Sequence, residues 1–371
     1  MALDKALKKF MDIFKAFEKS MEEYDYDPAQ KSKFWQKEFD RRKHLYKAEF
    51  LENFRNNNLS ETLDDQFPPM KQKEIFCDLL SELGEEFVFL NLNTKNIGNS
   101  RQVFTIDDKF VDAGQSFHIK WLHELINFVF SKKEIRYVCE IGGGYGSLAQ
   151  KIRSNINCKY LLIDLPETNI LAAYYLSKHF SNAKFLLADQ VQNKSVSKEH
   201  IDEHDFIIIP PWYEIKGIKF DLFINARSMM EMNAEAIQKY FDFIHANITD
   251  KGFFFNINRY YKDVVGYPIK LSEYPYDEKW NVVSSKPSWK QQHIHQLLTQ
   301  RTAERGNIQE ELIAIEELYQ ENKRTGKDLK KVNFLKKVPI FTIGLIVKIL
   351  KRTLPARLYK KLKHAIISQL E

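Results

Sequence analysis

Glycines are concentrated in one short segment of the sequence, YVCEIGGGYGSLAQKI, which contains Gly142, Gly143, Gly144 and Gly146. Apolar residues lead up to the first of these glycines, and an amphipathic run follows the last. This order predicts a strand, a tight turn and a helix, with the first backbone N–H groups of the helix directed at a ligand. The segment is therefore the first candidate for a binding site.

The glycine turn fits two cofactor patterns. Gly144-x-Gly146-x-x-Ala149 matches the alanine form of the dinucleotide fingerprint. Glu140-x-Gly142-x-Gly144-x-Gly146 resembles motif I of the class I S-adenosylmethionine (SAM) methyltransferases. The residues that flank the turn have to decide between a nicotinamide cofactor and a methyl donor.

Acidic residues close three successive predicted strands: Glu140, Asp164 in YLLID and Asp189 in KFLLAD. A carboxylate at Glu140 repels a pyrophosphate but attracts the cationic methionine end of SAM. Asp164 is placed to accept hydrogen bonds from both ribose hydroxyls, and Asp189 to accept one from the adenine amino group. A dinucleotide site predicts only the first of these two acids. Each acid alone could simply end a strand, but the three together with the glycine turn favour SAM.

Three segments, CEIGGGYGSLA, LLIDLPET and FDLFINARSMMEMN, are similar to bacterial sugar O-methyltransferases of surface-polysaccharide synthesis, over about residues 117–301. The resemblance implies a class I methyltransferase fold, SAM as cofactor and a sugar hydroxyl as acceptor, in a surface glycan or its precursor, which could be lipid-linked. Two alternatives stay open: an NAD(P)-dependent sugar oxidoreductase or epimerase, and a methyltransferase with a non-sugar acceptor. The cofactor contacts expected from the motifs and from this class of fold are Glu140, Gly142, Gly144, Gly146, Asp164, Leu165, Asp189, Gln190, Asn225, Ala226 and Ser228.

Glu231, just after the fourth expected strand, is the main candidate for a general base. The pKa of an alcohol is far above neutral, so its proton must leave as the oxygen attacks, and a carboxylate or an imidazole can take it. An alternative of equal weight is that Glu231 is a helix-start acid with Asn233 as N-cap. His293 is the second candidate for the base. It shares an H-x-H pattern with His295, and on a helix those two side chains would point in different directions.

Four residues are candidates for acceptor binding: Arg227, Arg259, Tyr260 and His118. Aromatic faces stack on sugar rings, and Arg binds anionic groups. An alternative of equal weight is that these residues belong to an ordinary rim of mixed residue types and bind no acceptor. The segment IIIPPWY resembles the Asn/Asp-Pro-Pro-Tyr signature of amine methyltransferases, but Ile209 occupies the position of the essential acceptor. We interpret it as an apolar strand ended by prolines, which argues against a nucleic-acid substrate. Too few ligands converge to predict a metal site.

Strands alternate with helices from residue 136 onward, which predicts a Rossmann-like α/β fold with a mostly parallel sheet and helices on both faces. The expected strands are Tyr137–Ile141, Tyr160–Asp164, Lys184–Ala188, Asp221–Ala226 and Gly252–Ile257. The sequence predicts an N-terminal helical cap (residues 1–110), a SAM-binding domain (111–301) and a helical, basic tail (302–371).

The C-terminal residues 329–370 contain many lysines and no Asp or Glu, in a chain of 371 residues with a formal net charge of +6. An apolar run within them does not suit a nucleic-acid-binding arm. It favours an amphipathic segment on the anionic surface of the inner membrane, and packing on a partner chain is the alternative. No signal peptide or membrane span is visible, so we expect a cytoplasmic protein, peripheral on the membrane. Oligomerisation stays open.

Overall fold

The computed structural model describes residues 2–24, 32–57, 59, 67–92, 95–106, 109–263 and 266–324. The chain divides into two compact units, Met1–Leu312 and Ile313–Glu371. The predicted basic tail, residues 329–370, lies outside the described residues. The expected domain bounds at residues 110 and 301 stay a prediction.

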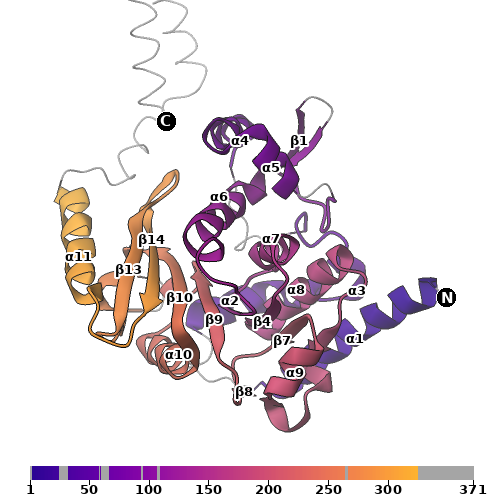
Figure 1. Cartoon of the computed structure of the whole chain (residues 1–371). Coiled ribbons are helices and arrows are strands. Elements are labelled where there is room, and N and C mark those ends of the chain that lie inside the picture. The colour runs from indigo at the N-terminus through magenta and orange to yellow at the C-terminus, as the bar shows by residue number, and fades with distance from the viewer. Residues whose placement is uncertain are drawn as a thin grey trace, which may run out of the picture. The chain divides into compact units, whose positions relative to one another are not determined.

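In the described part of the chain, eight strands form one central sheet, shown in Figure 1, with the order β13-β14-β10-β9-β3-β4-β7-β5. All neighbouring pairs are parallel except the two that involve β14, which is antiparallel to β10 and to β13. The strands of this sheet are β3 (Tyr137–Ile141), β4 (Lys159–Ile163), β5 (Phe185–Leu187), β7 (Phe206–Ile209), β9 (Phe220–Ala226), β10 (Ile248–Arg259), β13 (Trp280–Ser288) and β14 (Gln291–Arg301). Shorter pairs are formed by β1 (Val103–Ile106) with β2 (Lys109–Asp112), β6 (Ser195–Val196) with β8 (Glu214–Ile215), and β11 (Tyr261–Lys262) with β12 (Ile269–Lys270).

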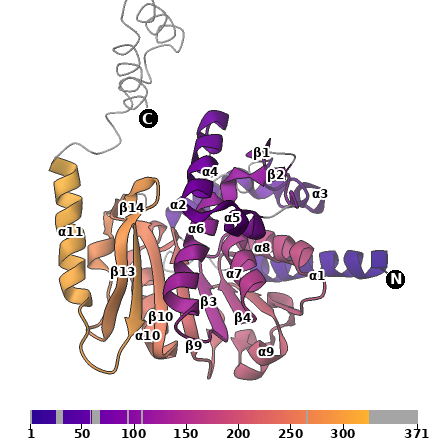
Figure 2. The ribbon, with the colours of Figure 1, turned by 45° about the horizontal axis from the view of Figure 1, so that its top comes forward.

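Helices precede, separate and follow the strands along the chain. They are α1 (Ala2–Glu22), α2 (Lys33–Arg42), α3 (Ala48–Leu51), α4 (Pro69–Leu83), α5 (Glu85–Asn91), α6 (Ser116–Leu125), α7 (Ser147–Asn155), α8 (Pro166–His179), α9 (Lys198–Glu203), α10 (Ala234–Asn247) and α11 (Ile308–Arg324). None of the helices among the described residues is long and apolar enough to cross a membrane. Figures 1 and 2 both show α1 alongside α8, and the two helices are in contact.

The central strands are buried on both faces, which explains why they are continuous apolar runs rather than alternating ones. Every residue of β7 is buried, as are the last four residues of β3 and of β4. The chain moves from β3 through α7 to β4 in one direction, and from β9 through α10 to β10 in the other. Because parallel crossovers are right-handed, α7 and α10 cover opposite faces of the sheet. The Rossmann-like fold predicted from the sequence is confirmed.

Two parts of the sheet differ from the expectation. Residues 291–301 form strand β14, which is not among the expected strands, because they pair with β10 on one side and with β13 on the other. Strand β7 lies between β4 and β5, so the strand that precedes Asp189 is not the neighbour of the strand that precedes Asp164. Both differences depend on pairing between segments that are distant in sequence, which local patterns do not specify.

Candidate functional site

A cavity opens at the carboxyl edge of the sheet, where β3 lies between β4 and β9 and the strand order reverses. This is the place where α/β sheets bind ligands. Its empty volume is about 1250 Å³, including space open to solvent. The lining residues come from α2, the turn before α6, α6 itself, the glycine turn, the ends of β4 and β7, and the segment from β9 to α10. They are Ser32, Trp35, Gly114, Phe117, His118, Trp121, Glu140, Gly142, Gly143, Gly144, Tyr145, Ser147, Leu148, Ile163, Asp164, Leu165, Thr168, Pro211, Ala226, Arg227, Ser228, Met230, Glu231, Met232, Asn233, Ala236 and Tyr240.

Gly142 and Gly144 in the turn have positive φ values, which favour glycine. Gly142 has a φ of +72°, and a Cβ at this position would overlap the side chain of Ser228. Gly144 has a φ of +58°, and its backbone N–H donates to Asp164 Oδ2 at 2.9 Å. The turn thus packs against the segment after β9 and binds the end of β4.

Glu140 closes β3 beside this turn and is 2% exposed. The hydroxyl of Tyr160 donates to its Oε2 at 2.8 Å. Burial raises the pKa of Glu140 to about 8, and the nearby Asp164 charge adds to this, while the Tyr160 hydrogen bond lowers it. A positive charge bound beside Glu140 would favour its ionised form.

Asp164 follows β4 and lines the same cavity. Its second oxygen, Oδ1, accepts from the backbone N–H of Leu165 at 2.7 Å. Burial raises the pKa of Asp164 to about 7, although the hydrogen bonds from Leu165 and Gly144 oppose the shift. Each carboxylate oxygen can accept more than one hydrogen bond, so these backbone contacts orient Asp164 and leave it capacity to bind ligand hydroxyls.

Buried asparagines fix the segment that follows β9. Asn225, which is fully buried, donates to the carbonyl of Ile141 at 2.8 Å and accepts from the backbone N–H of Met229 at 3.1 Å. Asn258 on the neighbouring strand donates to Asn225 Oδ1 at 2.9 Å, and its own Oδ1 accepts from the N–H of Met230 at 3.1 Å. The turn that leads to Glu231 is therefore held by side chains of two adjacent parallel strands.

Glu231 ends this turn and lines the cavity, where it forms an ion pair with Lys262 of β11. Both side chains are largely buried, with 12% and 13% exposed. Asn233 is the N-cap of α10 and accepts from the N–H of Ala236 at 2.8 Å. Glu231 thus precedes the cap and lies outside the first turn of α10, so its position is explained by the cavity and by Lys262 rather than by the helix.

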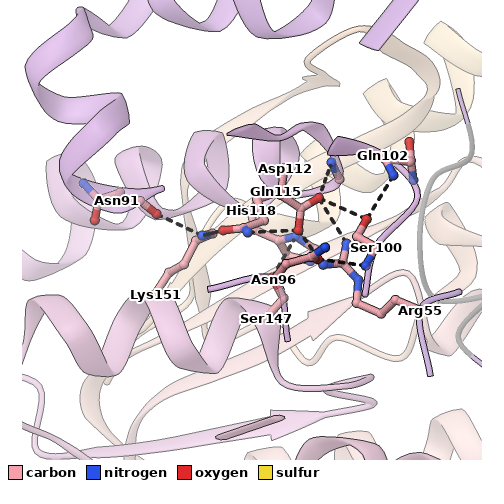
Figure 3. A network of polar contacts seen from close by, with 11 residues as sticks. Arg55, Asn91, Asn96, Ser100, Gln102, Asp112, Gln115, His118, Ser147 and Lys151 are labelled. Atoms are coloured by element: carbon pink, nitrogen blue, oxygen red, sulfur yellow. Dashed lines mark hydrogen bonds and ion pairs between the residues drawn. The ribbon is translucent and has the colours of Figure 1, made fainter. Parts of the chain in front are cut away.

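A polar network ties the helix after the glycine turn to the preceding segments (Figure 3). Lys151 of α7 is 1% exposed and donates to Gln115 Oε1 at 2.6 Å and to the carbonyl of Asn91 at 3.0 Å. Gln115 in turn donates to Asp112, which forms an ion pair with Arg55. Burial lowers the pKa of Lys151 to about 7. Because Gly114 and Phe117 flank Gln115 and line the cavity, the network positions one of its walls.

Most of the sequence-predicted site residues lie in the cavity wall, and a minority do not. Those in the wall are Glu140, Gly142, Gly144, Asp164, Leu165, Ala226, Arg227, Ser228, Glu231 and His118. Gly146 is the N-cap of α7, and Asn225 lies behind the wall. Tyr260 is buried, with its hydroxyl 2.8 Å from His295 Nδ1. Neither Tyr260 nor Arg259 is part of the wall.

Asp189 and Gln190, also predicted as cofactor contacts, lie outside the cavity wall. They lie in a short turn after β5, in contact with α1, and β7 separates β5 from β4. Pro211, which follows β7, occupies the cavity wall instead. His293 is also outside the wall, on β14, a strand at the antiparallel side of the sheet that is not among the expected strands.

Several wall residues were missed by sequence reasoning, among them Trp35 of α2, Trp121 of α6 and Tyr240 of α10. Each occurs in an ordinary amphipathic helix, where an aromatic residue signals core packing. Only the packing of these helices at the sheet edge brings the aromatic side chains to the cavity. Among the described residues, no group of three or more His, Cys, Asp or Glu side chains forms a metal site; the absence of a metal stays a prediction.

No family model matches the sequence, and no curated protein matches it. Similar solved structures include a methyltransferase from Pyrococcus furiosus, with 12% identity and a TM-score of 0.35 over 62% of this chain and 98% of that one. Mitomycin 7-O-methyltransferase has 14% identity and a TM-score of 0.32, over 51% and 57%. Coclaurine N-methyltransferase, bound to N-methylheliamine and SAH, has 12% identity and a TM-score of 0.31, over 68% and 77%. These likenesses are too distant to assign a substrate or a cofactor.

Proposed function

We propose that the protein is a SAM-dependent O-methyltransferase that acts on a sugar hydroxyl of a bacterial surface glycan or its precursor. The observation that carries the proposal is the pair of carboxyl groups, Glu140 and Asp164, at the ends of β3 and β4, on either side of one glycine turn in one cavity. SAM has a positive charge at its methionine end and two ribose hydroxyls. The two carboxyl groups suit these features.

The same geometry argues against a dinucleotide. A Cβ at Gly143, in the middle of the turn, would lie 3.3 Å from Glu140 Cδ. A pyrophosphate held by this turn would therefore face the Glu140 carboxyl at short range. An anion there would keep Glu140 protonated, whereas a cation would bind the ionised form. This favours a methyl donor over NAD(P) and the oxidoreductase alternative.

Glu231 is the proposed base. Bound SAM supplies an electrophilic methyl group. Glu231 takes the proton of the acceptor hydroxyl as the oxygen forms its bond to the methyl carbon and the carbon–sulfur bond breaks. Lys262 and the buried Asn258 hold the Glu231 segment in place. The aromatic side chains in the cavity wall, Trp35 and Tyr240, offer faces on which a pyranose ring can stack.

Calorimetry with SAM, S-adenosylhomocysteine, NAD and NADH tests the cofactor. We expect binding of the first two and none of the last two; binding of NADH without SAM would overturn the proposal. Mass spectrometry of sugars and glycan fractions incubated with the protein and SAM then tests the acceptor. If amine compounds are methylated and no sugar is, the protein is still a methyltransferase but the proposed sugar acceptor is wrong.

The proposed place of action is the cytoplasmic surface of the membrane, where the basic residues 329–370 would contact anionic lipid. Removal of these residues should lower sedimentation with anionic liposomes and leave SAM binding unchanged. High salt should release the full-length protein, because the attraction is screened. A full-length protein that ignores liposomes would point to a partner chain.

A further inference from the structure

The tip of the β13–β14 hairpin has an unusual sequence for a tight turn. Ser288 pairs with Gln291, so the two strands are joined by Trp289 and Lys290. Two-residue hairpin turns favour glycine or asparagine, because their backbone needs positive φ values. Lys290 has a φ of +57°, which a residue with a Cβ rarely adopts. Turn formation alone does not account for these two residues, and strained positions of this kind are concentrated at functional sites.

The hairpin tip lies at the same edge of the sheet as the cavity. Strand β14 is antiparallel to β10, and Ile294 near its start pairs with Arg259 at the end of β10. The tip is therefore beyond the carboxyl end of β10, and Figures 1 and 2 both show it beside α4 and α6. Because α6 supplies part of the cavity wall, contacts between the tip and α6 act on that wall.

Polar contacts hold the hairpin on α4 and α6. The indole Nε1–H of Trp289 donates to Glu82 Oε1 of α4 at 2.7 Å. The other oxygen of Glu82 is 2.9 Å from the Nζ of Lys120, which belongs to α6. Farther along the hairpin, Lys286 of β13 is ion-paired with Glu124 of α6 at 2.8 Å. Glu82 thus connects the tip to α6, and Lys286 makes a second connection.

An aromatic contact links the same tip to the cavity. Trp289 packs on Phe117, which is 2% exposed and lines the cavity. The two rings meet edge to face, with their centroids 5.6 Å apart. Phe117, Lys120 and Glu124 follow one another at intervals of three and four residues, so they share one face of α6. The hairpin therefore contacts a single continuous face of this helix.

A different face of α6 contacts the helix that follows the glycine turn. His118 Nδ1 is 3.4 Å from the Oγ of Ser147, the first residue of α7 (Figure 3). His118 and Trp121 line the cavity together with Phe117 and the glycines of the turn. Helix α6 is thus in contact with α7 at one face and with the hairpin at another, beside the proposed site of the methyl donor.

We propose that Trp289 is a positioning residue for the methyl donor: through Phe117 it holds α6 against the bound cofactor. This inference rests on the proposed function, because it takes SAM to bind beside the glycine turn. Trp289 itself is not part of the cavity wall, so its effect on the cofactor passes through Phe117. Even a small outward shift of α6 would weaken binding, since a gap between wall and ligand removes dispersion contacts.

The first test measures the affinity for S-adenosylhomocysteine by calorimetry. Trp289→Ala should weaken binding about 2- to 10-fold, the range for an aromatic pair. Trp289→Phe keeps a ring on Phe117 and should retain most of the affinity. Adding Trp289→Ala to Phe117→Ala should cause little further loss, because both changes act through the same contact. Additive losses, or full affinity in Trp289→Ala, would overturn the inference.

Tyr137→Ala is the matched control. Tyr137 is also a half-buried aromatic residue, with an acidic hydrogen-bond partner, Asp202, and a lysine, Lys198, over its ring. These are the same kinds of partner that Trp289 has. Because Tyr137 begins β3, at the edge of the sheet away from the cavity, its loss should leave S-adenosylhomocysteine affinity unchanged. Equal losses of affinity in the two alanine variants would reduce the role of Trp289 to general stability and contradict the proposal.

The second test does not depend on the cofactor. Hydrogen exchange in the ligand-free protein, followed by mass spectrometry, reports local opening of α6. Exchange in α6 should be faster in Trp289→Ala and unchanged in Tyr137→Ala. If the wild type binds no S-adenosylhomocysteine but α6 is loosened in Trp289→Ala, the proposed function fails while Trp289 still positions the cavity wall. Unchanged exchange in α6 of Trp289→Ala would refute the positioning role.

Discussion

The two ends of the cavity differ in how their charges are satisfied. At the acidic end, Glu140 and Asp164 are hydrogen-bonded by neutral donors, the Tyr160 hydroxyl and backbone N–H groups, and burial raises the pKa of both carboxyl groups. At the other end, Lys262 already has a charged partner in Glu231. The pKa values of these two carboxyl groups at the acidic end lie near neutral pH. A cation that binds at the acidic end can therefore ionise them. At the other end, the ion pair with Lys262 holds Glu231, the proposed base, in position.

The glycine turn connects these two ends, and Gly142→Val should have the largest effect. Its side chain would overlap Ser228, so the substitution displaces the turn and the segment after β9 together. We expect SAM binding to be lost in calorimetry. Gly84→Val is the control, because Gly84 has a similar φ of +82° but no heavy atom within 4 Å of an added Cβ. Equal loss of binding in both variants would show that backbone strain, not the overlap, is responsible.

Glu231→Gln tests the catalytic role at the Lys262 end of the cavity. Glutamine keeps the size of the side chain but cannot take a proton, so kcat should fall about 10²–10⁴-fold while SAM affinity holds. His293→Ala, which changes a residue outside the cavity wall, should leave kcat near that of the wild type. Near-full turnover in Glu231→Gln would make Glu231 a positioning residue, and a larger loss in His293→Ala would transfer the role of base to the histidine.

Asp164→Ala should weaken SAM binding by about 1–3 kcal/mol, the value of a charged acceptor for ligand hydroxyls. Asp189→Ala is the matched control, since both acids follow strands of the same sheet but only Asp164 lines the cavity. Calorimetry should show unchanged SAM affinity for that variant. A comparable loss in Asp189→Ala would contradict the placement of β7 between β4 and β5.

The smallest expected effect is a pH dependence of SAM affinity. The pKa values of Asp164 and Glu140 are raised to about 7 and about 8, so a bound cation must displace protons near neutrality. Affinity should rise several-fold from pH 7 to pH 8 and level off above, with protons released on binding; Glu140→Gln should flatten the profile. Affinity that falls over this range would indicate an anionic ligand at the glycine turn.

Local sequence patterns determined the part of the site that is contiguous in the chain. The strand, glycine turn and helix of residues 137–155 follow from an apolar run, glycines that have positive φ and an amphipathic segment, and the structure has them at the predicted positions. Glu140 lies near the carboxyl end of β3 and Asp164 directly follows β4, as the sequence predicts. The carboxyl ends of adjacent parallel strands meet at one edge, so these two acids share a cavity.

The tertiary structure alone decided which strands are neighbours and which helices cover the cavity. Pairing of β7 with β4 moved Asp189 away from the cavity, and pairing of β14 with β10 made a strand of the segment that carries His293. Trp35 reached the wall through the docking of α2. Strand pairing and helix docking depend on contacts between segments far apart in the chain. Their energies come from burial and hydrogen bonding across those segments, which no local pattern of residues contains.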